Sequence, residues 1–238
     1  MSSKGRGADS VESDFYATPA WATTAILKGL FETSAHLFIG HDRPLRILEP
    51  TAGKGAIVKV LREWFPNAVI DACELDRARA EQLSASGLCN NVTQGDFADF
   101  QGHGYKYDLI LTNPPFTCTI SIIERCFPFV ADNGRIVHLL RQAILASTER
   151  APFWKRNAAQ QYILPRRPSF ARSLKCGEPK RCGWATIQEL DASRPEKCPG
   201  CSGKIASTTS DSADYAWFVF GQGVEREWRI LDIDRSAA

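Results

Sequence analysis

The sequence predicts an α/β protein with a doubly wound parallel sheet and a small cysteine-rich insertion. Strand-like and helix-like segments alternate between residues 45 and 140, which is typical of parallel βαβ units. The runs at 107–112 and 135–140 are apolar almost throughout, as expected for strands that are covered on both faces. Four of the eight cysteines cluster between residues 176 and 201, beyond the alternating region, and they mark the insertion.

Local signals indicate where the individual elements begin and end. The glycine-containing turn TAGKG follows the first strand, Pro66 ends the next helix, and Gly87 lies at the end of the helix after it. The turn Asp132-Asn133-Gly134 precedes the fifth strand. The predicted helices cover residues 19–35, 57–65, 77–85 and 120–130. The predicted strands cover residues 45–50, 68–74, 91–96, 107–112, 135–140, 161–165, 215–221 and 228–233.

Length and composition indicate a globular protein with one main domain. A chain of 238 residues can form one α/β domain with a small appendage, and 44% apolar with 24% charged residues is an ordinary balance. No apolar run reaches the roughly 18 residues of a membrane helix, and the N-terminus lacks a signal-peptide pattern, so we expect a cytoplasmic protein. We expect disorder over residues 1–13, the α/β domain over 14–170 and 214–238, and the insertion over 171–213, here called the cysteine segment.

Positive charge is concentrated around the cysteine segment. The formal net charge of the chain is only +2, which neither favours nor excludes a polyanionic partner. Between residues 166 and 204, however, nine Lys and Arg residues stand against four acidic residues. This excess of about five positive charges predicts a basic surface beside the cysteines, and such a surface suits contacts with phosphates.

The first strand, turn and helix form a candidate nucleotide-binding motif. Gly53 and Gly55 lie where glycine lets a ligand approach the backbone at a helix N-terminus. Glu74, about 20 residues farther on at the end of the second strand, is placed to bind both hydroxyls of a ribose. Glu49 beside the turn would repel a pyrophosphate but suits a cationic amino or sulfonium group, which favours S-adenosylmethionine over NAD. The alternative interpretation is a tight turn before a surface helix.

The motif Asn113-Pro114-Pro115-Phe116 directly follows the fourth strand, at the sheet edge where such folds bind ligands. The lone pair of an exocyclic amino group is delocalised into its ring, so the group is a poor nucleophile. Acceptors at its two N–H groups, the Asn113 oxygen and the Pro114 carbonyl, would favour a tetrahedral nitrogen in the transition state. The prolines stiffen the backbone, and Phe116 offers a face for stacking the base. The alternative is a turn that ends a strand, with Phe116 in the core.

With these motifs in place, the chain resembles the amino methyltransferases of DNA, specifically adenine-N6 enzymes whose cofactor motifs precede the catalytic motif. The resemblance covers residues 14–140 and implies a Rossmann-like methyltransferase fold. DFYATP and LEPTAGKG correspond to contacts with the methionine part, CELD to the ribose and adenine, and GDF to the N6 amino group of the cofactor. The implied cofactor contacts are Tyr16, Thr18, Pro19, Glu49, Gly53, Gly55, Glu74, Leu75, Asp96 and Phe97.

The resemblance implies methyl transfer from S-adenosylmethionine to the N6 amino group of adenine in DNA. LPRRPSF and DYAWFVF further resemble the closing segments of small, often phage-encoded, adenine methyltransferases. Three alternatives stay open. The first is an RNA adenine methyltransferase, and the second is a protein glutamine methyltransferase, whose motif usually has Tyr where this chain has Phe116. The third is a zinc module that binds nucleic acid without catalysis.

The cysteine segment departs from this resemblance and has the pattern of a metal site. Its four cysteines are spaced Cys176-x5-Cys182-x15-Cys198-x2-Cys201, and no histidine lies within the segment. Two close pairs of thiolates separated by a loop suit a tetrahedral structural zinc. A polar insertion of this size cannot build its own core, so metal binding would supply its folding energy. We therefore predict a zinc-bound basic flap that contacts the nucleic acid. The alternative is a disordered loop with incidental thiols.

Overall fold

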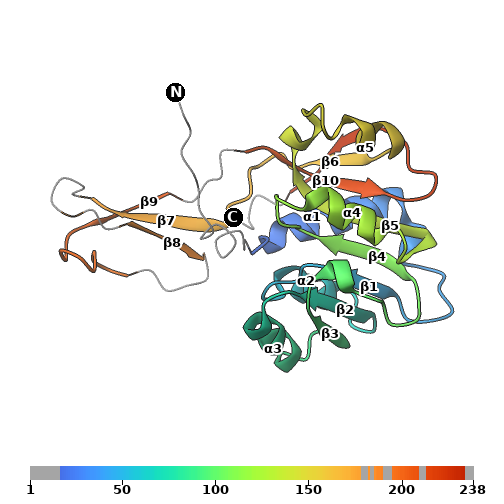
Figure 1. Cartoon of the computed structure of the whole chain (residues 1–238), viewed down its shortest axis with the longest axis horizontal. Coiled ribbons are helices and arrows are strands. Elements are labelled where there is room, and N and C mark those ends of the chain that lie inside the picture. Colours follow the sequence, from blue (N-terminus) through green and yellow to red (C-terminus); the bar gives the residue numbers. More distant parts are fainter. Residues whose placement is uncertain (1–16, 178–181, 183–184, 190–194, 209–212, 234–238) are drawn as a thin grey trace.

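The protein consists of an eight-stranded mixed sheet between two helical layers and a separate three-stranded sheet, as Figure 1 shows for the computed structural model. The structure describes residues 17–177, 182, 185–189, 195–208 and 213–233. The predicted disorder of residues 1–13 and the predicted cofactor contact Tyr16 therefore lie outside the described residues.

The observed elements follow the alternating sequence pattern closely up to residue 141. The helices are α1 (Ala20–Thr33), α2 (Ala56–Trp64), α3 (Arg77–Ala85), α4 (Thr119–Cys126) and α5 (Ala151–Arg156), with 3-10 turns η2 (Ala35–Leu37), η3 (Phe97–Asp99) and η4 (Gln142–Leu145). The strands of the large sheet are β1 (Arg46–Glu49), β2 (Val69–Glu74), β3 (Asn91–Gln94), β4 (Tyr107–Thr112), β5 (Val130–Arg141), β6 (Gln160–Ile163), β10 (Tyr215–Phe220) and β11 (Trp228–Ile230).

The large sheet has the order β11-β6-β10-β5-β4-β1-β2-β3. Strands β1 to β5 are parallel, which confirms the predicted doubly wound half. Strand β10 runs antiparallel to both β5 and β6, so the complete sheet is mixed. The carboxyl ends of β1 to β4 consequently meet at one edge of the sheet, where a fold of this kind binds its ligand.

Each face of the sheet has its own hydrophobic core. One core contains apolar residues of α1, α2 and α3, and the other contains those of η3, α4 and α5. Successive side chains of β10 enter opposite cores: Trp217 packs beneath α1 and donates its indole N–H to Ala22, whereas Phe218 packs on the other face. Among the described residues, no helix has the length and apolar character needed to cross a bilayer.

The helix that we predicted over residues 120–130 ends at Cys126, and β5 begins earlier than expected, at Val130. Phe127 still has helical dihedrals, but Pro128 after it has no N–H with which to continue the helical hydrogen bonding, so the helix is short. Strand β5 reaches back because Tyr107 pairs with Val130 before the register shifts ahead of Leu109. Helix α5 was not predicted at all.

The three-stranded sheet lies within the cysteine segment. Strands β7 (Ala171–Cys176), β8 (Ala185–Glu189) and β9 (Ile205–Thr208) pair antiparallel in the order β8-β7-β9. In Figure 1 this sheet extends away from the large one. The sequence predicted a polar insertion here but none of its strands.

His138 in β5 is a histidine that the fold keeps uncharged. Its side chain is fully buried, and Nδ1 has no hydrogen-bond partner among the described residues. Its Nε2 lies 3.7 Å from the sulfur of Cys126, which is also buried. Burial lowers the pKa of His138 from 6.5 to about 3.

This buried histidine predicts a loss of stability in mild acid. Between pH 6.5 and about 3 the unfolded chain binds a proton that the folded protein does not, so the free energy of unfolding falls as the pH falls, by up to about 1.4 kcal/mol per pH unit. Above pH 6.5 the contribution is constant. His138→Leu should flatten this dependence in urea unfolding series, whereas His36→Gln, at an exposed histidine, should keep it. An unchanged slope in His138→Leu would contradict the assignment.

Candidate active site

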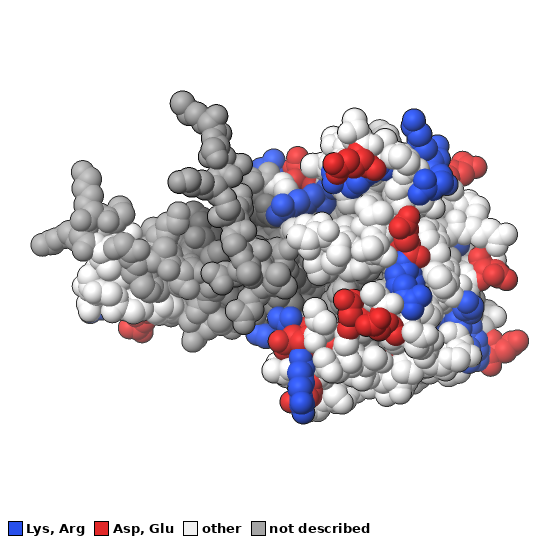
Figure 2. Space-filling view, viewed as in Figure 1, with Lys and Arg blue, Asp and Glu red and all other residues white. Residues whose placement is uncertain are grey.

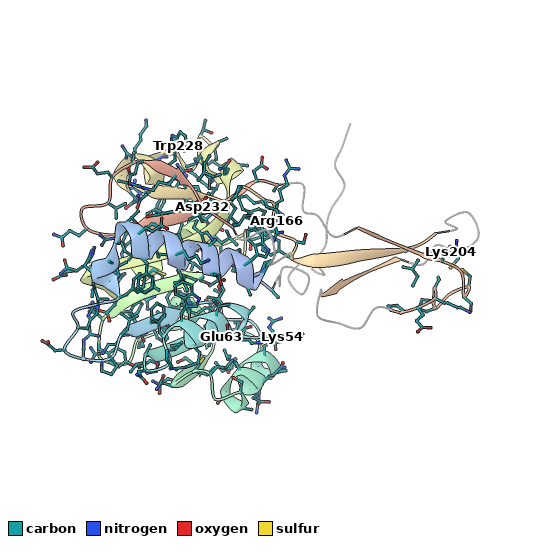
Figure 3. All side chains as sticks on the ribbon, turned by 180° about the vertical axis from the view of Figure 1, so that it is seen from behind. Lys54, Glu63, Arg166, Lys204, Trp228 and Asp232 are labelled. Carbon is teal, nitrogen blue, oxygen red and sulfur yellow. The ribbon has the colours of Figure 1, made fainter. Side chains whose placement is uncertain are left out.

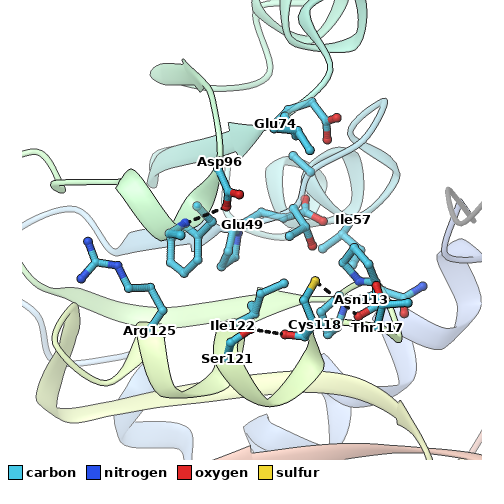
Figure 4. A pocket seen from close by; sticks show the side chains of 18 of the residues that line it. Glu49, Ile57, Glu74, Asp96, Asn113, Thr117, Cys118, Ser121, Ile122 and Arg125 are labelled. Atoms are coloured by element: carbon cyan, nitrogen blue, oxygen red, sulfur yellow. Dashed lines mark hydrogen bonds between the residues drawn. The ribbon is translucent and has the colours of Figure 1, made fainter. Parts of the chain in front are cut away.

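A cavity of about 860 Å³ opens at the carboxyl edge of β1, β2, β3 and β4 (Figure 4). Its size is within the range of about 300–1,000 Å³ that is usual for small-molecule sites. The cavity brings together most of the residues predicted from the motifs. Those that line it are Thr18, Glu49, Glu74, Leu75, Asp96, Phe97, Asn113, Pro114, Pro115 and Phe116. Pro19, Gly53 and Gly55 are not part of its lining.

The two glycines of the turn after β1 do not line the cavity, but they position residues that do. Both have left-handed backbone conformations, with φ of 55° at Gly53 and 82° at Gly55, which favour glycine. A Cβ on Gly55 would lie 2.6 Å from a methyl carbon of Leu83, so glycine also lets α3 pack against the turn. The Gly53 amide donates to Glu74 over 2.7 Å. The glycines thus position the carboxylate at the end of β2.

Glu74 is held in place by three donors. Its Oε2 accepts from Gly53, and its Oε1 accepts from the Asp76 amide at 2.9 Å and from Arg79 Nε at 3.0 Å. The side chain is buried, so the ion pair with Arg79 is shielded from water. Asp76 caps α3 and thereby orients the turn that carries Arg79. The carboxylate is therefore fixed at the cavity wall before any ligand binds.

Glu49 is a buried carboxyl group with unsatisfied bonding capacity. It is 2% exposed, and its Oε2 has no hydrogen-bond partner among the described residues. Burial raises its pKa well above the ordinary value, and the nearby charge of Glu74 raises it further, while a backbone hydrogen bond from Val58 acts in the opposite direction. A cation placed in the cavity would reverse this shift and stabilise the ionised form. Glu49 therefore fits a ligand that carries a positive charge.

Asp96, Phe97 and Leu75 form the part of the cavity beyond Glu74. Asp96 accepts the Ala98 amide at 2.8 Å through Oδ1, as the dashed line in Figure 4 shows, and this bond caps η3. Phe97 is buried, whereas Leu75 is 60% exposed although it is a large apolar residue. An apolar side chain that faces a cavity suits the flat face of an aromatic ligand, and a neighbouring carboxylate suits an amino group on that ligand.

Asn113 has a defined orientation at the end of β4. Its Nδ2 donates to the Thr18 hydroxyl over 3.1 Å, and Thr18 is buried. With the amide nitrogen turned to Thr18, the Asn113 oxygen is the atom available to accept a bond from a substrate amino group. The Pro115 carbonyl, in turn, accepts the Thr119 hydroxyl at 3.0 Å, which ties the motif to the first turn of α4.

The four clustered cysteines have the geometry of a metal site. Their sulfur atoms all lie within 4.8 Å of one another, with 3.4 Å between Cys176 and Cys201 and 3.7 Å between Cys182 and Cys198. None is in a disulfide. Tetrahedral zinc with Zn–S bonds of about 2.3 Å requires sulfurs about 3.8 Å apart, so the donor set fits this ion.

The backbone around Cys198 supports the same interpretation. Burial opposes ionisation of the Cys198 thiol, but hydrogen bonds from the amides of Gly200 and Cys201 and from the thiols of Cys182 and Cys201 together lower its pKa. The turn closes through the Ser202 amide, which donates to Cys198 at 2.7 Å, and Gly177 bonds to Lys204 across the two cysteine pairs. The structure therefore brings both pairs together as the spacing predicted.

Comparison with known proteins gives a consistent class of relatives. No protein-family model matches the chain. The tRNA1(Val) (adenine(37)-N6)-methyltransferase of Pedobacter heparinus is 32% identical over 83 residues, or 32% of this chain and 35% of that protein. Its counterpart from Serratia proteamaculans is 31% identical over 157 residues, or 62% and 57%. The ribosomal protein uL3 glutamine methyltransferase of Bradyrhizobium diazoefficiens is 34% identical over 77 residues, or 30% and 24%. The chain thus spans between a quarter and little more than half of these relatives.

Solved structures resemble the chain over most of its length. A candidate RNA methyltransferase from Pyrococcus horikoshii aligns with a TM-score of 0.53 at 14% identity, covering 92% of both chains. The plantazolicin methyltransferase BpumL in complex with a triazolic desmethylPZN analog and SAH aligns with a TM-score of 0.51 at 13% identity, covering 89% of this chain and 88% of that one. The chain has a methyltransferase fold. The predicted Rossmann-like fold is thereby confirmed, whereas none of the three curated relatives above is named as a DNA enzyme.

Within this methyltransferase fold, several residues of the cavity lining were missed by the sequence analysis. Among them, Arg79 binds Glu74, Cys118 lies exposed two residues after Phe116, and Arg125 comes from α4. Arg79 could have been anticipated from its place in the first turn of the helix that follows Glu74. Arg125 had no such signal, because only the packing of α4 over the sheet brings it to the cavity.

Proposed function

We propose that this chain is an enzyme that transfers a methyl group from S-adenosylmethionine to the N6 amino group of adenine in a nucleic acid. One observation carries the proposal: a single cavity holds a buried carboxylate with an unsatisfied oxygen, Glu49, and an oriented amide, Asn113. The first suits the cationic cofactor and the second suits the amino group that receives the methyl.

The cavity fits the cofactor from end to end. Glu49 would bind the positively charged methionine part, which satisfies its orphaned oxygen. Glu74 would bind the ribose hydroxyls, and Leu75 and Asp96 would contact the adenine ring and its amino group. Bound S-adenosylmethionine supplies the electrophilic methyl group. The chain's own residues have only to orient the cofactor and exclude water from it.

The substrate amino group would lie against the catalytic motif. The Asn113 oxygen and the Pro114 carbonyl would accept its two N–H bonds, and these bonds strengthen as the nitrogen becomes tetrahedral and positively charged. Phe116 would stack on the base after it has left its helix or loop. No base is needed before methyl transfer, because the nitrogen can lose its proton afterwards.

The comparisons favour RNA as the substrate at least as well as they favour DNA. Two of the curated relatives are named for methylation of an adenine in tRNA. Figure 2 shows acidic and basic side chains interspersed on one face of the large α/β unit, so the basic excess around the cysteine segment is the feature that suits a polyanion. DNA, the substrate implied by the sequence resemblance, remains the second arm of the test.

Protein glutamine is a second candidate substrate because one relative is a ribosomal protein glutamine methyltransferase. A glutamine side-chain amide also has a delocalised lone pair and two N–H bonds, so Asn113 and the Pro114 carbonyl could serve it equally. The basic cysteine segment favours a nucleic acid over this alternative.

The decisive experiment is methyl transfer with radiolabelled S-adenosylmethionine. Purified protein is incubated separately with bulk tRNA, ribosomal RNA, single-stranded DNA, duplex DNA and ribosomal proteins, and the products are digested and separated. We expect labelled N6-methyladenine from a nucleic acid. Label only in protein would select the glutamine alternative, and binding of cofactor without transfer to any of these acceptors would refute the proposal.

The ribose assignment gives a prediction for cofactor affinity. Glu74→Ala removes charge-assisted hydrogen bonds, so the binding free energy of S-adenosylmethionine should weaken by about 1–3 kcal/mol, which raises its dissociation constant roughly 5- to 150-fold. Titration calorimetry measures this directly. Glu81→Ala, which removes an exposed carboxylate from helix α3 after β2, should leave the affinity unchanged. Wild-type affinity in Glu74→Ala would show that this carboxylate does not bind the cofactor.

The cysteine segment would serve as a structural zinc module within this enzyme. Zinc bound by Cys176, Cys182, Cys198 and Cys201 would stabilise the small sheet, and residues 14–170 with 214–238 would form the methyltransferase domain. The root of the segment is the pair of positions, 167 and 214, where the chain leaves the large α/β unit and returns to it. Arg167 pairs with Asp214 at 2.8 Å and so joins the two ends of the segment. Figure 3 shows Arg166 near this root and Lys204 on the segment itself.

A further inference from the structure

The ring of Phe116 has a cationic neighbour that the proposed chemistry does not yet use. Arg141, the last residue of β5, places its guanidinium carbon 4.0 Å from the centre of the Phe116 ring. This is well within the distance of about 6 Å at which a cation is attracted to an aromatic face. Arg141 is not part of the cavity lining, whereas Phe116 is. Phe116 is thus in contact with the guanidinium of Arg141 and is also part of the cavity wall.

The guanidinium is itself held by the neighbouring strand. Arg141 Nε donates to the Tyr215 hydroxyl at 2.9 Å, and the two residues are paired in register between β5 and β10. Tyr215 is buried, and its ring centre lies 6.3 Å from that of Phe116. The position of Arg141 is thus supported by backbone pairing in the sheet and by the hydrogen bond to Tyr215.

We propose that Arg141 is a positioning residue for the base subsite: it holds Phe116 from behind so that the ring presents a fixed face to the target adenine. This inference rests on the proposed function, because it concerns the residue that orients Phe116 for binding the target base. A cation behind the ring also draws electron density away from the opposite face, which makes that face a better stacking partner for an electron-rich purine.

The same contacts connect the base subsite to both ends of the cysteine segment. Phe170, the last residue before β7, packs edge-on against Tyr215 with 5.1 Å between ring centres. Tyr215 follows the return of the segment to the large sheet. The aromatic ring that would receive the base is therefore buttressed by the root of the segment, through Tyr215 and Arg141.

The test compares four variants in bulk tRNA and, in parallel, in genomic DNA. Arg141→Ala should lower kcat/KM for the nucleic acid at least tenfold, mainly through a higher KM, because the base meets a mobile ring. Arg141→Lys keeps the positive charge but lacks the planar guanidinium that lies over the Phe116 ring, so it should recover part of the lost kcat/KM. Tyr215→Phe keeps the ring but removes the hydroxyl that binds Arg141, and it should lower kcat/KM about threefold. Arg77→Ala, an exposed arginine on α3, is the matched control.

Cofactor affinity separates a positioning role from general damage. We expect all four variants to bind S-adenosylmethionine with wild-type affinity in calorimetry, because none of the altered side chains lines the cavity. If Arg141→Ala matches Arg77→Ala in KM and kcat while the wild type methylates nucleic acid, this inference is overturned and the proposed function stands. If Arg141→Ala loses cofactor affinity and rate together, its role is structural and the inference is again overturned. If the wild-type protein transfers no methyl group to any nucleic acid, both the proposed function and the inference about Arg141 are refuted.

Discussion

Asn113→Ala should bind S-adenosylmethionine nearly normally and yet transfer methyl groups at least about 100-fold more slowly than the wild type. The Asn113 oxygen would be the acceptor that gains strength as the attacking nitrogen becomes tetrahedral, so its loss raises the transition state more than the bound ground state. Cofactor affinity should persist because Glu49 and Glu74 are untouched by the change. Single-turnover rates on the acceptor identified by product analysis, together with calorimetry, measure the two quantities separately.

Two further variants sharpen this result. Thr18→Val removes the hydroxyl that receives the Asn113 amide, so the oxygen is present but less well oriented, and a smaller loss of rate is expected. Asn133→Ala changes an exposed asparagine in the long strand β5 and should have no effect. Parallel losses of cofactor affinity and rate in Asn113→Ala would mean that the motif is a structural turn, and the catalytic assignment would fall.

The large sheet could be predicted from the sequence because its signals are local. Strands β1, β4 and β5 contain apolar runs flanked by proline, asparagine or glycine, and the order of helices and strands then determines a parallel arrangement. The predicted end of α4 was wrong because β5 pairs backward to Val130, a contact with Tyr107 that no local pattern indicates. Strand-to-strand register is a property of two segments distant in sequence.

The candidate site was predictable to the same extent. Glu49 and Glu74 end their strands, and Asp96 and Asn113 lie within two residues after theirs, so parallel topology alone brings all four to one edge of the sheet. The contacts that position them were not predictable. Thr18 meets Asn113 although the two are 95 positions apart in the sequence, and the Arg141 contact with Phe116 depends on how the side chains pack at the end of β5. Sequence motifs indicate which side chains come together at the site, whereas tertiary packing determines the contacts that orient them.

Removal of zinc should have the largest effect on the structure of the cysteine segment. We expect one zinc ion per chain by metal analysis of freshly purified protein, and we expect chelation or Cys198→Ser to unfold the segment. Structural zinc contributes about 10–16 kcal/mol to the folding of small modules, far more than three short strands of β7, β8 and β9 could supply. Cys89→Ser, at a half-buried cysteine outside the cluster, should retain the metal.

The functional consequence should appear in nucleic-acid binding rather than in cofactor binding. If the segment's basic residues contact phosphates, its unfolding releases them from fixed positions, so affinity should fall tenfold or more at about 0.1 M salt and the salt dependence should become shallower by roughly 0.9 for each lost contact. Affinity for S-adenosylmethionine should stay the same, because the cavity is built from the large sheet. Protein without zinc would remove the structural part of this prediction. Normal binding and methylation by Cys198→Ser would leave the segment without a role in substrate recognition, since the positive charges would then act equally well without their scaffold.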